Sequence, residues 1–274
     1  MIHCGASGWM RPDWAGVVYP RLKPRGFHPL EYLAHCVDLV EVEGPLRPEL
    51  VRLWLSRISH NRQFTFTVVL DRAFTHERTL DAGAIRQFND ALWPLGHAGR
   101  LGAVLMRFPW SFRFTRENRD FLIELRRTFH EFPLAAELRH ASWTLDEALG
   151  TLMDYRIGFC NVDQPAGARA LRPSSIVTSP VGYVRLLGRA GGDWTDEEAA
   201  ADYLYAPPEL GEWQRHIERL AAHTTATFVV AANSVAGKSV INAMQLRAML
   251  REATTAPPQR ETSSGPARLP GRAA

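Results

Sequence analysis

GAVLMRFPWSFRFTRENRDFLIELRRTFHEFPLAAEL (102–138) begins and ends with a short apolar run and has a longer amphipathic segment between the two. Short apolar runs of this kind are typical of buried strands. Within the middle segment (116–129), Phe121, Leu125 and Phe129 recur at a spacing that places them on one face of a helix. The stretch therefore predicts a strand–helix–strand unit of a parallel sheet, with its helix packed on the outside.

The same alternation extends along the chain, and the number of strand-like runs decides the architecture. The runs lie at residues 2–6, 39–43, 63–70, 102–108, 133–138, 157–162, 182–187 and 227–232. Helical periodicity is present at 29–37, 48–58, 82–95, 116–129, 145–155, 209–222 and 239–252. Eight strands separated by helices predict an α/β fold, a single-domain (β/α)₈ TIM-type barrel over residues 1–253. A doubly wound open sheet is the main alternative.

Composition narrows the broad class of the protein. The chain of 274 residues is 46% hydrophobic and has a formal net charge of +3, which is too small to indicate a nucleic-acid partner by itself. No apolar run reaches the roughly 18 residues that span a bilayer, and the N-terminus has no signal-peptide pattern. We therefore expect a soluble, cytoplasmic protein with no membrane partner. From Thr254 the chain is rich in Pro, Ser, Gly and Arg, which predicts a disordered tail over 254–274.

Polar residues gather where the predicted strands end, which is where active sites of this fold lie. Tyr183 shares the strand face of Arg185, because it lies two positions earlier. We interpret three residues as candidate catalytic acids or bases: Glu137, Asp163 and His140. We interpret a second set as substrate-binding: Glu41, Arg107, Arg139, Trp143, Tyr183, Arg185 and Asn233. The arginines suit an anionic group, because a guanidinium donates two parallel hydrogen bonds to a carboxylate or phosphate.

Each of these residues also has a purely structural interpretation. Glu41, Glu137, Arg107 and Arg185 could form an ion network that caps the core, since a buried charge must be paired. His140 could be a loop histidine that bonds to the backbone. No metal site is predicted, because the histidines show no metal-binding spacing and the cysteines Cys4, Cys36 and Cys160 are widely separated. The sequence leaves any cofactor unknown.

Residues 232–239, ANSVAGKS, match a relaxed phosphate-binding loop pattern between a predicted strand and helix. Such a loop needs further strands downstream to supply a magnesium-binding Asp, and only one helix and the tail follow. We therefore reject nucleoside-triphosphate binding, although the amides of Gly237 and Lys238 could still bind an anion.

Several motifs resemble the domain-of-unknown-function 72 family, also called YecE-like. They are CGASGWMRPDWAGVVYP (4–20), DRAFTH (71–76), AELRHASW (136–143), VDQP (162–165), YVRLLG (183–188), WTDEE (194–198), Asn233 and Asn242. The resemblance covers nearly the whole ordered length and implies a TIM-type barrel. It implies no settled activity, substrate or cofactor.

The chain departs from the pattern of that family at four places. They are EGPLRP (43–48) after the second strand, Val69 in place of a lysine, Leu187 in place of a histidine, and AAN (231–233) in place of an aromatic followed by two asparagines. These losses of polar or aromatic groups indicate either a changed substrate or a weakened site.

Three functions remain open from the sequence. The first is a hydrolase or lyase acting on a small phosphorylated or sugar-like, anionic substrate. The second is a noncatalytic module that binds nucleic acid through Trp9, Trp14, Trp110 and Trp143 beside arginines. The third is a scaffold for a protein partner, with a degenerate site. All three require that charged residues from distant parts of the chain converge on one opening.

Overall fold

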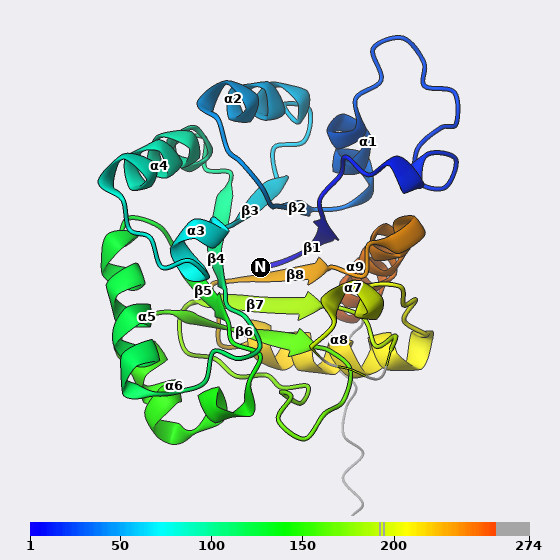
Figure 1. Ribbon diagram of the computed structural model, residues 1–274. Helices are drawn as coiled ribbons and strands as arrows, with labels where there is room; N and C mark the ends of the chain where they lie inside the picture. The colour runs from blue at the N-terminus through cyan, green and yellow to red at the C-terminus, as the bar shows by residue number, and fades with distance from the viewer. Residues whose placement is uncertain (192, 194, 256–274) are drawn as a thin grey trace, which may run out of the picture.

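Eight parallel strands pair in chain order and close into a ring, because β1 pairs with both β2 and β8. The computed structural model describes residues 1–191, 193 and 195–255 (Figure 1). The strands are β1 (Ile2–Ser7), β2 (Leu39–Val42), β3 (Thr65–Val69), β4 (Leu101–Arg107), β5 (Leu134–Glu137), β6 (Gly158–Asp163), β7 (Val181–Leu186) and β8 (Ala226–Ala231). The predicted TIM-type barrel is confirmed, and the open-sheet alternative is wrong.

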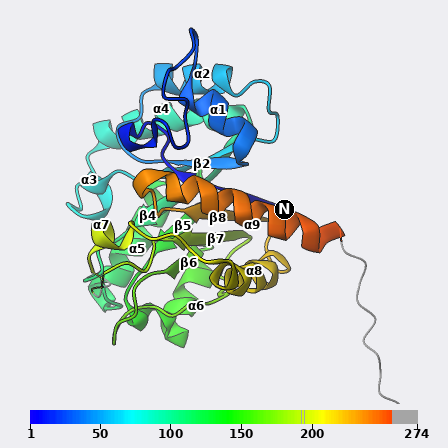
Figure 2. The ribbon, with the colours of Figure 1, turned by 90° about the vertical axis from the view of Figure 1, so that its right-hand side faces the viewer.

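Helices surround the barrel and connect most of its strands. They are α1 (Pro29–Cys36), α2 (Pro48–Arg57), α3 (Arg72–Thr75), α4 (Ala82–His97), α5 (Arg116–Thr128), α6 (Asp146–Asp154), α7 (Glu197–Ala200), α8 (Pro207–Ala221) and α9 (Lys238–Thr255). Single turns of 3₁₀ helix occur at Pro12–Trp14, Ala141–Thr144 and Val235–Gly237. Helix α9 packs against β1 and β8, as Figure 2 shows from the side.

The apolar periods seen in the sequence become the faces that pack on the barrel. In α5, Phe121, Leu122 and Leu125 are buried, and the Thr115 side chain caps the helix by accepting from the amide of Asn118. The short helices α3 and α7 were not expected, because four residues are too few to show a helical period. Within the described residues, no helix is long and apolar enough to cross a membrane.

The connection from β6 to β7, residues 164–180, contains no helix. Two polar side chains, one in β6 and one in the connection itself, hold it in place instead. The amide side chain of Asn161 accepts from the backbone N–H of Ile176 at 2.8 Å and donates to its carbonyl at 3.0 Å, as a neighbouring strand would. The hydroxyl of Thr178 bonds to the backbone at Ile157 and Phe159 in the same manner. This pairing satisfies backbone groups that a helix would otherwise satisfy itself.

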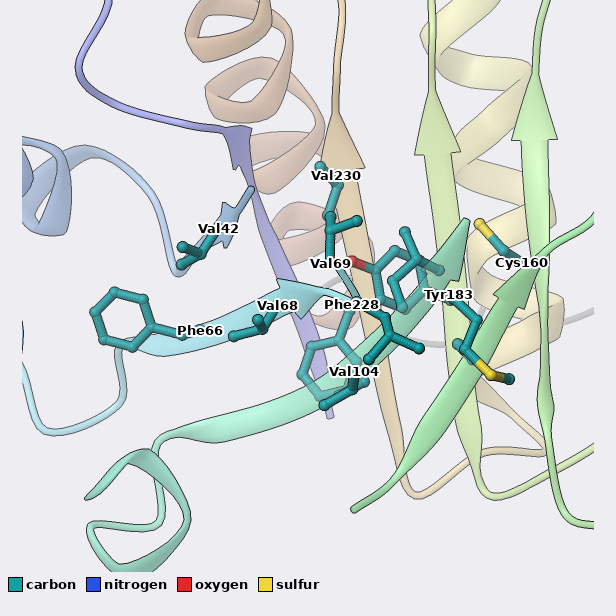
Figure 3. Packing of buried hydrophobic residues seen from close by; sticks show 14 of the residues in the cluster. Val42, Phe66, Val68, Val69, Val104, Cys160, Tyr183, Phe228 and Val230 are labelled. Carbon is teal, nitrogen blue, oxygen red and sulfur yellow. The ribbon is translucent and has the colours of Figure 1, made fainter. Parts of the chain in front are cut away.

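The barrel interior is filled by side chains from several strands. Figure 3 shows Tyr183 and Phe228 packed together with Cys160 and valines of neighbouring strands. The ring centroids of Tyr183 and Phe228 lie 6.3 Å apart. The layer above this one is charged rather than apolar, and it forms the base of the site described below.

The predicted tail 254–274 begins within α9, which ends at Thr255. Residues 256–274 lie outside the described part of the chain, so the expected disorder of the tail stays a prediction.

Gly5 allows β1 and β2 to approach closely, since a Cβ at this position would lie 1.8 Å from the carbonyl oxygen of Leu39. We expect Gly5→Ala to lower the free energy of unfolding by more than about 2 kcal/mol, because the strands must separate. Gly150 within α6 has open space around it, so Gly150→Ala should raise stability by about 0.5–1 kcal/mol. Urea unfolding of both variants checks this. Equal effects would show that strand closure does not depend on Gly5.

Candidate functional site

A cavity of about 810 Å³ opens at the carboxyl ends of the strands. Its volume falls in the range of small-molecule sites. We call it the mouth cavity, and it is lined by Ser7, Gly8, Trp9, Met10, Arg11, Val42, Glu43, Pro45, Leu50, Trp54, Arg72, Arg107, Arg185, Leu187, Glu197, Glu198, Ala201, Ala232, Ser234 and Val235. These residues come from both ends of the chain and from its middle. They lie side by side only because the strands close into a barrel.

Beneath the cavity, Arg185 of β7 joins two carboxylates from distant strands. Its Nη1 donates to Glu137 Oε2 at 2.6 Å, and its Nη2 donates to Glu41 Oε1 at 2.7 Å. Both carboxylates are fully or almost fully buried. The hydroxyl of Tyr183 donates to the other oxygen of Glu41 at 2.8 Å and lies 2.9 Å from the hydroxyl of Thr67. This arrangement matches the ion network that the sequence offered as a structural interpretation.

Each charged group of this network stabilises the ionised form of its partners. Burial alone would raise the pKa of Glu137, but Arg185, Arg107 and Arg139 outweigh that effect and hold the pKa below its ordinary value. Burial works against the charge of Arg185 as well, and the two carboxylates raise the pKa of this arginine well above its ordinary value. Glu137 is therefore ionised at neutral pH, and it does not line the cavity.

Arg107 extends the network to the rim. It donates to Glu43 Oε1 at 2.8 Å and to Glu197 Oε2 at 2.5 Å, and its Nε lies 3.9 Å from Glu137 Oε1. The other oxygen of Glu197 accepts from Arg139 Nη1 at 2.6 Å, and Arg139 Nε donates to Gln164. We call the linked set the mouth network, which comprises Glu41, Glu43, Glu137, Glu197, Arg107, Arg139 and Arg185. It connects β2, β4, β5, β7 and α7.

Helix α7 reaches the rim because Gly188 follows β7. Gly188 has a φ of 102°, and a Cβ there would lie 1.9 Å from the carbonyl oxygen of Ala200. A larger residue would push α7 away from the strand end. The motif YVRLLG thus positions both Arg185 on the floor and Glu197 on the wall.

Part of the cavity lining is apolar and aromatic. Trp9 and Trp54 pack edge to face with ring centroids 5.0 Å apart, and Leu50 and Pro45 continue the surface. The indole N–H of Trp9 is buried without a hydrogen-bond partner in the structure. Such groups are rare in proteins.

Asp163 lies in a different network from the other candidate acids. Arg189 contacts both of its oxygens, at 2.8 and 3.1 Å, and also donates to Glu209. Burial raises the pKa of Asp163, against the opposing effect of Arg189. Asp163 does not line the mouth cavity. The sequence predicted that Asp163 would share one site with Glu137 and Arg185, and the structure does not bring the three residues together.

Three further candidates have structural surroundings. His140 accepts from the amide of Ser142 at the start of a 3₁₀ turn, and burial lowers its pKa. Trp143 is fully buried and donates to the carbonyl of Phe112 at 2.7 Å. Asn233 donates to the carbonyl of Tyr203, in the segment before α8, and to the side chain of Asn242 on α9. None of the three lines the cavity.

The phosphate-binding motif and the tryptophans can also be placed. The ammonium of Lys238 pairs with Asp202. Trp14, like Trp143, is fully buried and donates to the carbonyl of Ser234. Trp110 is 41% exposed. Three of the four rings, those of Trp9, Trp14 and Trp143, are buried, so the tryptophans do not form one stacking surface.

Sequence reasoning missed Arg72, Trp54 and Glu197 as cavity residues. Arg72 lies in the DRAFTH motif and Glu197 in WTDEE, so the motifs contained the signal, but neither residue belongs to a predicted strand. Trp54 lay in a helix predicted over 48–58 and was not singled out. Among the described residues, no three His, Cys, Asp or Glu side chains are grouped so that they could hold a metal ion.

The fold and the mouth cavity define the class as a TIM-barrel protein with a charged cavity at the carboxyl ends of its strands. Residues 3–266 match the family described as Protein of unknown function DUF72, and the chain belongs to that family.

Relatives support this membership. A DUF72 family protein of Thermotoga maritima MSB8 is 29% identical, with a TM-score of 0.77 over 92% of this chain and 99% of that chain. A DUF72 family protein of Enterococcus faecalis V583 shares the fold at 22% identity, with a TM-score of 0.78 over 92% of this chain and 96% of that one. The UPF0759 protein YunF of Bacillus subtilis (strain 168) is 24% identical over 176 residues, and the match covers 60% of this chain and 62% of that protein.

Removing Arg185 should leave two buried carboxylates without their cation. We expect Arg185→Met to lower the free energy of unfolding by about 3–5 kcal/mol near neutral pH. Without the arginine, the folded-state pKa of Glu137 should rise, because burial then has less opposition. The loss should then shrink as the pH falls from about 8 to about 5, because protonation of Glu137 removes an unpaired buried charge.

Arg119→Met is the matched control, because Arg119 also contacts two carboxylates but lies on the surface of α5. It should cost less than about 1 kcal/mol at either pH. Urea unfolding at both pH values measures the four free energies. Similar losses for Arg185→Met and Arg119→Met would contradict the central role of Arg185.

Proposed function

We propose that the chain is an enzyme of the hydrolase or lyase type that acts on a small phosphorylated or sugar-like substrate in the mouth cavity. The observation that supports this most directly is the lining of one cavity by two kinds of surface. Arg72, Arg107 and Arg185 line the cavity together with Trp9 and Trp54. A ligand with an anionic group and a less polar body suits both surfaces.

The anionic part of the ligand would be attracted by arginines whose charge is fixed. Arg107 is held on two sides by Glu43 and Glu197, and Arg185 is held by Glu41 and Glu137. Arg72 lines the cavity and is exposed; its Nη1 lies 3.3 Å from His76 Nε2, and it has no ion pair in the described part of the chain. An unpaired, accessible guanidinium is the group that gains most from a ligand phosphate or carboxylate.

The less polar part of the ligand would lie on the aromatic wall. A sugar ring presents C–H groups that pack on an indole face and hydroxyls that accept hydrogen bonds. The unpartnered N–H of Trp9 can donate to such an acceptor. Leu187 and Ala232 add small apolar patches to the lining, and Ser7 and Ser234 add hydroxyl groups.

Hydrolysis and elimination both need a group that removes a proton within hydrogen-bond reach of the substrate. Glu137 was the expected base, but it is buried beneath Arg185 and does not reach the cavity. The carboxylates of Glu43 and Glu197 line the wall and are partly exposed, at 48% and 41%. We assign proton transfer to these two residues and assign to Glu137 the positioning of Arg185.

A noncatalytic binding module, for nucleic acid or a protein partner, is the alternative. It is favoured by the positions at which the chain departs from the pattern of its family. Pro45, Leu187 and Ala232 fall at these departures, and all three line the cavity. The cavity has thus lost polar groups where a reaction would use them.

A ligand screen separates the two functions. We expect phosphorylated or carboxylated sugars to raise the melting temperature of the protein, and Arg72→Gln to weaken their binding about tenfold by removing a charge-assisted hydrogen bond. Arg86→Gln on α4 makes the same charge change away from the cavity and should leave affinity unchanged. Isothermal titration calorimetry measures both affinities, and product analysis on each binding compound tests for turnover.

Equal weakening by Arg72→Gln and Arg86→Gln would show that the ligand does not bind in the mouth cavity. Tight binding without any product would favour the noncatalytic alternative. Salt-dependent binding of oligonucleotides with no small-molecule ligand would assign that alternative to nucleic acid.

A further inference from the structure

Glu197 presents one carboxylate to two arginines at the same time. Its Oε2 accepts from Arg107 Nη2 at 2.5 Å, and its Oε1 accepts from Arg139 Nη1 at 2.6 Å. Arg107 ends β4, and Arg139 lies two residues after the end of β5, so two neighbouring strands of the barrel position the two guanidinium groups. Two donors that each contact a different oxygen form a rigid receptor for a carboxylate or a phosphate.

The two sides of this contact differ in how firmly they are held. The side chain of Arg139 is 1% exposed, and it also donates to the buried Gln164. The side chain of Glu197 is 41% exposed and belongs to α7, a helix of only four residues at the edge of the cavity. The arginines are thus part of the barrel, whereas the carboxylate is supplied from the wall that covers it.

Another anion can take the place of the Glu197 carboxylate between the two guanidinium groups, so that each arginine still contacts a negative oxygen. Arg107 would retain Glu43 at 2.8 Å and Glu137 at 3.9 Å. The cavity that the anion would enter is already lined by both Arg107 and Glu197. The exchange therefore needs movement of one partly exposed side chain and no rearrangement of the strands.

We propose that Arg107 and Arg139 form the recognition site for the carboxylate or phosphate group of the ligand, and that Glu197 occupies this site when the ligand is absent. The proposal rests on the proposed function and names the residues that bind the anionic group. Binding then displaces the Glu197 carboxylate into the cavity beside the bound molecule. There it can take part in proton transfer, so occupation of the anion site makes the proton-transfer group available.

The test uses inorganic phosphate and malonate as probes, with binding to the full chain measured by isothermal titration calorimetry. In Glu197→Ala the internal competitor is gone, so at least one of the two anions should bind about tenfold or more tightly than to the wild type. The anion with the larger gain identifies the chemistry of the recognised group. Adding Arg107→Gln to Glu197→Ala should abolish the gain.

Glu198→Ala is the matched control. Glu198 neighbours Glu197 on α7 and lines the same cavity, but it forms no ion pair among the described residues. Removing it changes the general charge of the cavity by the same amount and should alter anion affinity by less than about threefold. Equal gains in Glu197→Ala and Glu198→Ala, or no gain in either, would overturn the proposal.

The outcome is separable from that of the proposed function. If sugars bind to the wild type with an affinity that does not respond to Glu197→Ala, the anion site is wrong and the function stands. If Glu197→Ala gains phosphate affinity while no compound of the ligand screen is bound or converted, the anion site stands and the proposed function fails.

Discussion

The pairing of Arg185 with Glu41 and Glu137 is the interaction on which the upper half of the barrel depends. Charges in a barrel interior are costly unless each has a partner and their remaining hydrogen bonds are satisfied. Three strands that are far apart in sequence contribute these groups, and they meet only because the ring closes. Closure and charge pairing therefore support each other. The pairing also fixes the cation that forms the floor of the mouth cavity.

From this fixed base the mouth network becomes more exposed toward the rim. Arg185 and its two carboxylates are buried, Arg107 is 16% exposed, and Glu43 and Glu197 are partly open to solvent. The buried members provide geometry and charge, while those at the rim can meet a ligand. Because of this gradient, one network has two roles. Glu41, Glu137 and Arg185 cap the core as a buried ion network, and Arg107 at the rim remains able to bind a ligand. The proposed site thus lies one layer above the residues that the sequence singled out for catalysis.

Much of the fold was predictable from the sequence, because strands such as 102–108 and helices such as 116–129 show their periods locally. The rule that strand ends meet at one face of a barrel also predicted which charged residues converge, namely Glu41, Arg107, Glu137, Arg139 and Arg185. That rule does not say which side chains reach a cavity, so it could not separate Asp163, which pairs with Arg189, from Arg185. Glu197 and Arg72 were missed because they lie in α7 and α3, which are too short to leave a pattern.

The central claim is that the charged residues at the strand ends surround one anion-binding cavity. Crystals grown with selenate test it most directly, because selenium reveals the position of the anion by anomalous scattering. The account predicts the strongest selenium peak inside the mouth cavity, within hydrogen-bond distance of arginines that line it or underlie Glu197. Selenate bound only at arginines on the outer helices, with the mouth cavity empty, would contradict it.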